Sequence, residues 1–136
     1  MRFVDKDVNA KQLSPLNLAF IGDCIYEILV RETLVLDANR PVNDLHKESV
    51  KYVSAKAQTV AFEKIKDDLT EDELAMFKRG RNASKASVSK HASPEEYRAS
   101  TGFECLLGWL YLNGQLDRVH ELFDTLWQQF DPNETR

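Results

Sequence analysis

Cysteine is scarce in this sequence of 136 residues, which contains only Cys24 and Cys105. Two isolated cysteines do not make the disulfide framework of a small secreted domain. Each cysteine directly follows an acidic residue, Asp23 or Glu104, inside an apolar run. We therefore interpret both as small, buried core residues and expect neither a disulfide nor redox chemistry.

Long apolar runs are missing as well. No uncharged segment reaches the length that spans a membrane. The first residues also lack the basic start, apolar stretch and small-residue cleavage site of a secretory signal. We therefore expect a cytoplasmic protein with no membrane partner.

The alternation of apolar and polar residues that is typical of strands is almost absent. Apolar residues instead recur every three or four positions, which indicates helices. With 43% hydrophobic and 29% charged residues, a chain of this length can bury a core without disulfides or a structural metal. The sequence therefore predicts an all-α fold, a helical bundle, with residues 1–136 forming a single domain.

Capping residues divide this bundle into segments. Ser14 precedes Pro15, and capping-box patterns begin at Thr70 and Ser93, each of which has Glu three residues later. We expect the helices to run over about residues 15–36, 42–65, 71–77, 94–112 and 116–130.

Acidic residues are absent from Lys78 to His91, although the whole chain has a net charge of −4. This stretch holds five basic residues: Lys78, Arg79, Arg81, Lys85 and Lys90. From residue 80 to residue 93 it is also rich in Gly, Ala and Ser, which cannot bury themselves, so we predict a mobile loop. A basic loop on an acidic chain indicates an anionic partner, although a merely solvated loop remains the alternative.

Two acids are the strongest candidates for chemistry. Asp23 and Glu104 each lie in a helix that is apolar nearly all round, where an unpaired charge is costly. One interpretation is a pair of buried acids that accept hydrogen bonds from Tyr, Ser or Thr. The other is that both acids converge on a hard cation such as Mg²⁺, which prefers oxygen ligands. Zinc bound through the adjacent cysteines is disfavoured, because neighbouring helical residues point about 100° apart.

The helical stripes around these acids indicate what the acids face. Asp23 shares a stripe with Glu27, Phe20 and Leu16, a partly apolar face that suits a partner or a cleft better than open water. The stripe of Glu104 consists of Tyr97, Thr101, Gly108 and Tyr111. Glycine inside a helix is destabilising, so Gly108 indicates close approach of another backbone or of a ligand. The histidines stand alone, and we assign none as a general base: His46, His91 and His120.

Four separated stretches of the sequence resemble a known family. Residues 20–27 (Phe-Ile-Gly-Asp-Cys-Ile-Tyr-Glu) resemble the signature helix of the ribonuclease III family, and residues 101–111 resemble its second acidic helix. Residues 43–56 (Asn-Asp-Leu-His-Lys to Val-Ser-Ala-Lys) and 78–83 (Lys-Arg-Gly-Arg-Asn-Ala) are similar to the compact branch called Mini-ribonuclease III. The resemblance spans most of the chain, which leaves nothing for the double-stranded-RNA-binding domain of longer members.

The resemblance implies a homodimeric, helical endonuclease that uses Mg²⁺ to cleave double-stranded RNA and leaves short 3′ overhangs. For the compact branch it also implies maturation of the large-subunit (23S) ribosomal RNA precursor, with a ribosomal protein as a further candidate partner. Asp23 and Glu104 match catalytic, metal-binding positions of the family. Glu27 matches none of these positions, so we expect it to support the metal ligands without binding the metal itself. The aromatic ring of Phe20 would insert into the partner subunit.

The sequence departs from the family pattern at two places. Ala19 and Thr101 stand where the family usually has two further carboxylates. Both departures are similar to those of the compact branch, but they put a second tightly held metal in doubt. They also favour the alternative of a catalytically silent, ribonuclease III-like protein that binds RNA or the ribosome. An all-α interaction domain with no RNA role is disfavoured by the basic segment, whose Lys and Arg residues are the expected RNA-binding groups.

Overall fold

The computed structural model describes residues 2–85 and 92–131, and over these residues the protein is helical with no strand. The helices are α1 (Pro15–Asp37), α2 (Val42–Val53), α3 (Ala55–Ile65), α4 (Glu71–Ala83), α5 (Pro94–Leu112) and α6 (Leu116–Gln129). Short 3₁₀ turns cover Ala10–Gln12 and Lys66–Asp68. The predicted all-α class is therefore confirmed.

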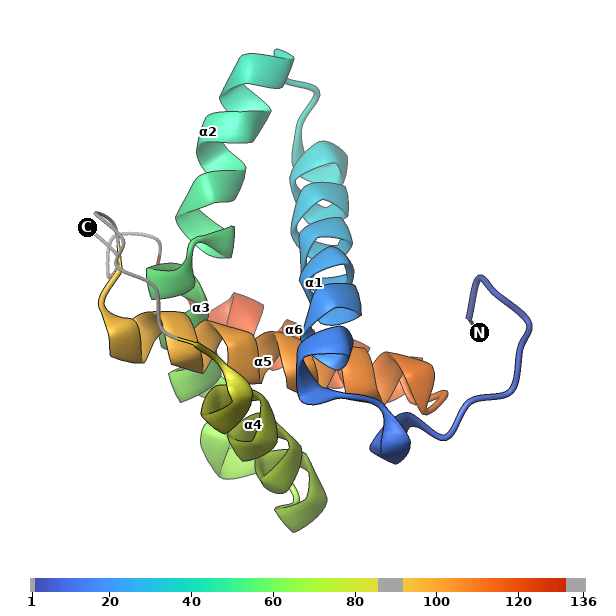
Figure 1. The fold of residues 1–136 in the computed structure, drawn as a ribbon. Coiled ribbons are helices and arrows are strands. Elements are labelled where there is room, and N and C mark those ends of the chain that lie inside the picture. The colour runs from blue at the N-terminus through green and yellow to red at the C-terminus, as the bar shows by residue number, and fades with distance from the viewer. Residues whose placement is uncertain (1, 86–91, 132–136) are drawn as a thin grey trace.

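Helix α5 lies at the centre of the arrangement (Figure 1) and contacts α1, α3, α4 and α6. Helix α1 crosses α5 and continues beyond it, where it pairs with α2 as an upright arm. Helix α4 lies on the other side of α5 from this arm. Among the described residues, no helix is long and apolar enough to cross a membrane.

The helices begin where the capping residues predict. The hydroxyl of Ser14 accepts a hydrogen bond from a backbone N–H in the first turn of α1. In the capping box of α4, Thr70 and Glu73 exchange hydrogen bonds of 2.9 and 3.1 Å, and Ser93 and Glu96 do the same at the start of α5. These exchanges satisfy N–H groups that a helix start leaves without partners.

Two predicted boundaries are wrong. The helix expected over 42–65 is broken at Ser54, whose extended backbone (φ −61°, ψ 157°) separates α2 from α3. The apolar period continues through the break, so periodicity alone does not reveal it. Helix α4 continues to Ala83 instead of ending near Phe77, which places Lys78, Arg79 and Arg81 on a helix rather than in a loop. The predicted loop residues 86–91, including Lys90 and His91, lie outside the described residues.

The core lies between α5 and the helices around it. Tyr26 and Phe103 make an edge-to-face contact with ring centroids 5.0 Å apart, and Phe62 stacks on Phe77 at 3.7 Å. Cys105 belongs to this core, whereas Cys24 is exposed on α1, so the prediction of two buried cysteines holds only for Cys105. The last helix, α6, contributes four buried apolar residues to the protein interior: Val119, Leu122, Phe123 and Leu126.

The crossing of α1 and α5 depends on two glycines. A Cβ atom on Gly22 would overlap the backbone carbonyl of Glu104, and one on Gly108 would overlap the carbonyl of Leu18. The two backbones therefore touch directly. Of the two explanations predicted for the glycine inside α5, another backbone or a ligand, the structure shows another backbone. Because Asp23 follows Gly22, the same contact brings Asp23 towards Glu104.

The variant Gly108→Ala should destabilise the protein by about 1 to 3 kcal/mol, because the new methyl group must push α1 away from α5. Helix propensity alone would favour alanine by about 1 kcal/mol, so the two effects have opposite signs. Urea unfolding measures the difference. Gly114→Ala is the control, because no atom lies within 4 Å of its Cβ position and only the strain of its φ of +75° applies. A Gly108→Ala protein at least as stable as the parent would contradict the close contact.

Candidate active site

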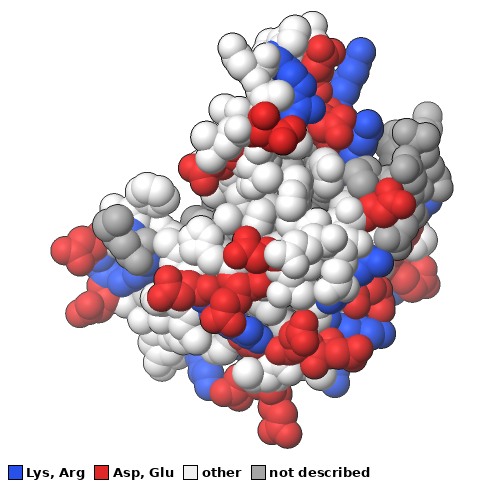
Figure 2. All heavy atoms as spheres, turned by 180° about the vertical axis from the view of Figure 1, so that it is seen from behind, with Lys and Arg blue, Asp and Glu red and all other residues white. Residues whose placement is uncertain are grey.

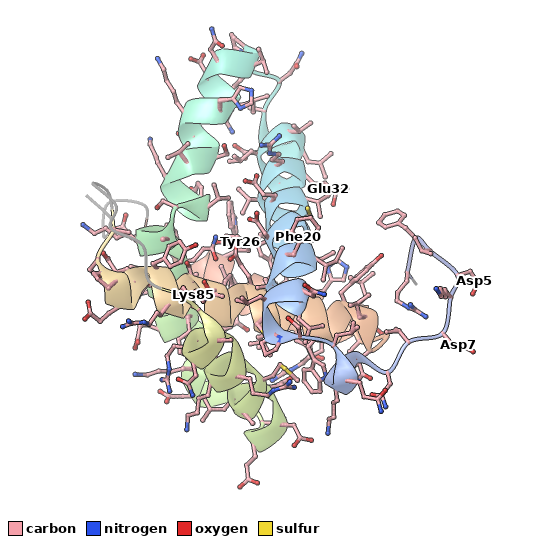
Figure 3. The ribbon with its side chains drawn as sticks, in the orientation of Figure 1. Asp5, Asp7, Phe20, Tyr26, Glu32 and Lys85 are labelled. Atoms are coloured by element: carbon pink, nitrogen blue, oxygen red, sulfur yellow. The ribbon has the colours of Figure 1, made fainter. Side chains whose placement is uncertain are left out.

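An open cleft of about 320 Å³ lies where α1, the end of α4 and α5 meet. Residues from both predicted stripes line it together with residues that follow α4: Leu16, Ala19, Phe20, Asp23, Ser84, Lys85, Tyr97, Thr101 and Glu104. Figure 3 shows Phe20 on α1 and Lys85 just after α4, near this meeting point. The fold therefore brings together two acids that lie far apart in the sequence.

Glu104 is the more buried of the two acids, and Asp23 is exposed at the cleft. Burial is the largest of the effects that raise the pKa of Glu104 from 4.5 to about 8. The neighbouring Asp23 contributes to the same shift, because it accepts a hydrogen bond from the protonated group and carries a like charge. The prediction that a charge would be costly to bury therefore holds for Glu104 but not for Asp23, which is exposed. Within residues 2–85 and 92–131, no Tyr, Ser or Thr donates a hydrogen bond to either carboxylate. The interpretation in which Tyr, Ser or Thr side chains satisfy the two acids thus lacks support among these residues.

The donor set fits a hard divalent cation. Two carboxylates share one cleft, and the part of the chain that the structure describes holds no group of three or more His, Cys, Asp or Glu side chains arranged to bind a metal ion. Mg²⁺ is commonly bound by one or two carboxylates while water and phosphate oxygens complete its octahedron. A closed zinc site needs four ligands. Neither cysteine lines the cleft, and burial raises the pKa of the Cys105 thiol to about 11, so zinc remains disfavoured.

The two family positions without carboxylates also lie in this cleft. Ala19 offers no ligand, and Thr101 uses its hydroxyl inside the protein, donating to the Tyr97 carbonyl at 3.1 Å and contacting Ser84 Oγ at 3.1 Å. Among the described lining residues, the cleft holds the two carboxylates that the sequence analysis selected and a single basic residue, Lys85.

Glu27 does not line the cleft. It lies one turn after Asp23 on α1, where Arg31 Nε donates a hydrogen bond to its carboxylate at 2.8 Å. The negative charge of Glu27 also raises the pKa of Glu104, but by less than burial and Asp23 do. Glu27 therefore acts on the site through electrostatics at longer range.

Gln58 on α3 is a site residue that the sequence analysis missed. Its side chain is only 3% exposed, and its Nε2 lies 2.9 Å from the Val53 carbonyl and 3.5 Å from Glu104 Oε2. The sequence analysis assigned Gln58 no role. One signal was available: Gln58 is three and seven residues before Ala61 and Ile65, so it shares their buried face.

The basic residues divide between the cleft and the last turns of α4. Lys85 lines the cleft, whereas the Arg81 guanidinium lies 5.8 Å from the ring centroid of Phe77. Arg81 also lines a second hollow with Asn82, Glu95 and Arg98. Arg98 is a cation that the sequence analysis missed because it lies outside the acid-free segment. On the opposite face of the molecule, acidic side chains run across the middle of the surface with basic ones between and below them (Figure 2).

Phe20 stands out from α1 with 81% of its surface exposed. Leu16, one turn earlier on the same helix, is 44% exposed and lines the same cleft. Exposed apolar side chains beside an acidic cleft are costly in water and are typical of an interaction surface.

Comparisons with known proteins identify the family of the chain. The family model described as "Ribonuclease III domain" matches residues 16–115. A Mini-ribonuclease 3 of Thermoanaerobacter sp. (strain X514) is 47% identical over 112 residues, covering 82% of this chain and 79% of the relative. One from Clostridium tetani is 40% identical over 129 residues, covering 91% and 85%. The crystal structure of a Fusobacterium nucleatum protein superposes with a TM-score of 0.79 at 27% identity, covering 90% of this chain and 98% of that one.

The chain therefore belongs to the ribonuclease III family of endoribonucleases and, within it, to the Mini-ribonuclease 3 branch. Enzymes of this family generally depend on a divalent metal, act on double-stranded RNA and usually work as dimers. A cleft with two carboxylates and a bordering lysine is chemically consistent with such an enzyme.

The raised pKa of Glu104 predicts a pH-dependent stability of the metal-free protein. The folded chain keeps this proton up to a pKa of about 8, whereas the unfolded chain loses it near 4.5. The bound proton therefore contributes fully to the free energy of unfolding below pH 4.5, and this contribution is lost as the pH rises through about 8. Glu104→Gln removes this loss, so above the folded pKa the variant should be more stable than the parent by on the order of 1 to 3 kcal/mol.

Urea unfolding in the presence of a chelator, at several pH values from acid to alkaline, measures this difference. We expect it to be small in acid and to grow as the pH rises. A constant difference over the whole range would mean that Glu104 is not a protonated, desolvated acid in the free protein.

Proposed function

We propose that the chain is a Mg²⁺-dependent endoribonuclease that cleaves double-stranded RNA during maturation of the large-subunit (23S) ribosomal RNA precursor, with residues 1–136 acting as one catalytic domain. The observation that carries this proposal is the convergence of Asp23 and Glu104 in one open cleft, in a chain of the Mini-ribonuclease 3 branch. A substrate of this kind would place the protein in the cytoplasm.

Asp23 and Glu104 would hold the cation, one from each of the two crossing helices. When bound, Mg²⁺ lowers the pKa of a water molecule and neutralises charge on a phosphoryl oxygen. Glu104 must give up its proton to bind, so metal binding competes with protonation at this residue. Lys85, which lines the same cleft, would bind a phosphate oxygen of the RNA.

Duplex RNA would approach along the basic residues of α4. The narrow major groove of A-form RNA hides its bases from side chains, so such proteins bind mainly phosphates and 2′-hydroxyls. Arg81 in the last turn of α4 and Lys85 at the cleft would contact the RNA first. Arg79 lies on another side of the same helix, where its guanidinium donates to the Lys11 carbonyl at 3.4 Å. Lys78, exposed on the same helix, and Lys90, outside the described residues, complete the proposed set.

A second copy of the chain would cover the exposed Phe20 and Leu16 of α1, with Phe20 as the anchor. Each subunit then cuts one strand, so that one encounter with the duplex yields a double-strand break. Glu27, which is paired with Arg31 on the same helix, would support the metal ligands without contacting the cation itself.

The variants Asp23→Asn and Glu104→Gln should each abolish Mg²⁺-dependent cleavage of a long RNA duplex, because an amide keeps the shape but loses the charge that binds the cation. Glu27→Gln should lower the rate by only about 10- to 100-fold. Gel assays with Mg²⁺ and with a chelator measure these rates. Full activity in either amide variant would refute the site, and a parent protein without metal-dependent cleavage would support a catalytically silent RNA-binding protein.

The double variant Arg81→Ala/Lys85→Ala should weaken duplex binding and flatten its dependence on salt, since each lost phosphate contact lowers the slope of log affinity against log salt by somewhat under about 1. Fluorescence anisotropy in Ca²⁺, at a series of salt concentrations, gives the slope. The control is Lys51→Ala/Lys66→Ala, which removes two exposed lysines that pair with Glu48 and Glu63. Equal slopes for the parent and the Arg81/Lys85 variant would exclude this docking surface.

The variant Phe20→Ala should weaken the dimer by about 2 kcal/mol or more, which is typical of a buried aromatic anchor, and should reduce cleavage at low protein concentration. Sedimentation over a range of concentrations measures the association. Leu36→Ala is the matched control, because Leu36 is 79% exposed but lies on the opposite side of α1. A parent chain that is monomeric and fully active would remove this role.

A further inference from the structure

The break between α2 and α3 frees one backbone carbonyl beside the cleft. In an uninterrupted helix the Val53 carbonyl would accept a hydrogen bond from the N–H of Ala57. Here the Ala57 N–H donates instead to Ser54 Oγ at 3.1 Å, because Ser54 is extended and caps α3. The Val53 carbonyl is therefore free, and the side chain of Gln58 occupies it at 2.9 Å.

This contact fixes the orientation of the Gln58 side chain. A carbonyl oxygen can only accept, so the amide must turn its nitrogen, not its oxygen, towards Val53. The nitrogen carries two hydrogens, and the second faces Glu104 Oε2 at 3.5 Å. Gln58 is 3% exposed, which leaves its amide little freedom to rotate away. The corner of α2 and α3 thus presents a fixed N–H donor to the Glu104 carboxylate.

We propose that Gln58 is a positioning residue for the metal site: anchored on the Val53 carbonyl, its amide holds the Glu104 carboxylate in the orientation that binds the cation. This inference rests on the proposed function of Glu104 as a metal ligand. The contact of 3.5 Å is long for a neutral pair, and an ionised carboxylate accepts shorter and stronger hydrogen bonds. The donor therefore becomes most effective in the charged form that holds the cation.

The need for such a residue follows from the small number of ligands. Ala19 and Thr101 stand in the cleft where the family usually has two further carboxylates, so two carboxylates must hold the cation. A carboxylate that loses its orientation therefore weakens this site more than it would weaken a site with four carboxylates. Hydrogen bonds that orient ligating carboxylates commonly change metal affinity by about 10- to 100-fold. A residue that only satisfied the free Val53 carbonyl would affect stability without affecting metal affinity, and this difference can be measured.

The experiment compares Mn²⁺ binding by Gln58→Met and by the parent protein, without RNA, by electron paramagnetic resonance. Methionine has a similar length and suits a buried position but donates no hydrogen bond. We expect the Mn²⁺ dissociation constant to rise about 10-fold or more. The Mg²⁺ concentration for half-maximal cleavage should rise in parallel, with a smaller change in the rate at saturating Mg²⁺. If Gln58→Met fails to fold, Gln58→Leu takes its place.

The matched control is Thr59→Val. Thr59 is the next residue of α3, and its hydroxyl donates to the Ala55 carbonyl at 2.9 Å and the Glu96 carbonyl at 3.3 Å, away from the acids. This variant also loses buried hydrogen bonds, so it should lower thermal stability while leaving the Mn²⁺ constant unchanged within about 2-fold. The double variant Gln58→Met/Glu104→Gln should bind Mn²⁺ no more weakly than Glu104→Gln alone, because the two residues act through one contact.

Asp23→Asn separates the failure of this inference from the failure of the proposed function. If Asp23→Asn weakens Mn²⁺ binding but folded Gln58→Met binds like the parent, Gln58 has only a structural role and the inference is wrong. If Asp23→Asn also binds like the parent, the metal site itself is misplaced and both proposals fall.

Discussion

The direct contact between the backbones of α1 and α5 is the constraint on which the rest of the structure depends. Helices normally lie 8–10 Å apart because side chains separate them. At this crossing Gly22 and Gly108 remove the separating side chains, so each helix touches a backbone carbonyl of the other. The residues next to the contact have little freedom of position, and Asp23 and Glu104 are among them. The glycines thus place the acids more rigidly than flexible packing could.

This placement has an electrostatic cost that the protein bears in its free state. Burial and the neighbouring Asp23 raise the pKa of Glu104 to about 8, so the free protein keeps this acid protonated at neutral pH. Such destabilised sites are common where function competes with stability. The surrounding structure limits the cost: Asp23 remains exposed, and the Gln58 amide faces Glu104.

Much of this architecture could be predicted from the sequence, because the relevant signals are local. The capping boxes at Thr70 and Ser93 set the starts of α4 and α5, and the glycine at 108 indicated a close backbone approach. The break at Ser54 could not be predicted, since its cause is a side-chain cap competing with a helical hydrogen bond while the apolar period continues. Gln58 was missed for the same reason, because its partners are a carbonyl freed by that break and a carboxylate 46 residues away.

The central claim is that Asp23 and Glu104 together bind one divalent cation. Isothermal titration calorimetry of Mn²⁺ binding near neutral pH, in buffers with different ionisation enthalpies, tests it most directly because it counts both cations and protons. Since Glu104 is protonated there in the free protein, we expect one cation per chain and the release of about one proton on binding. Binding without proton release, or no saturable binding, would contradict the claim.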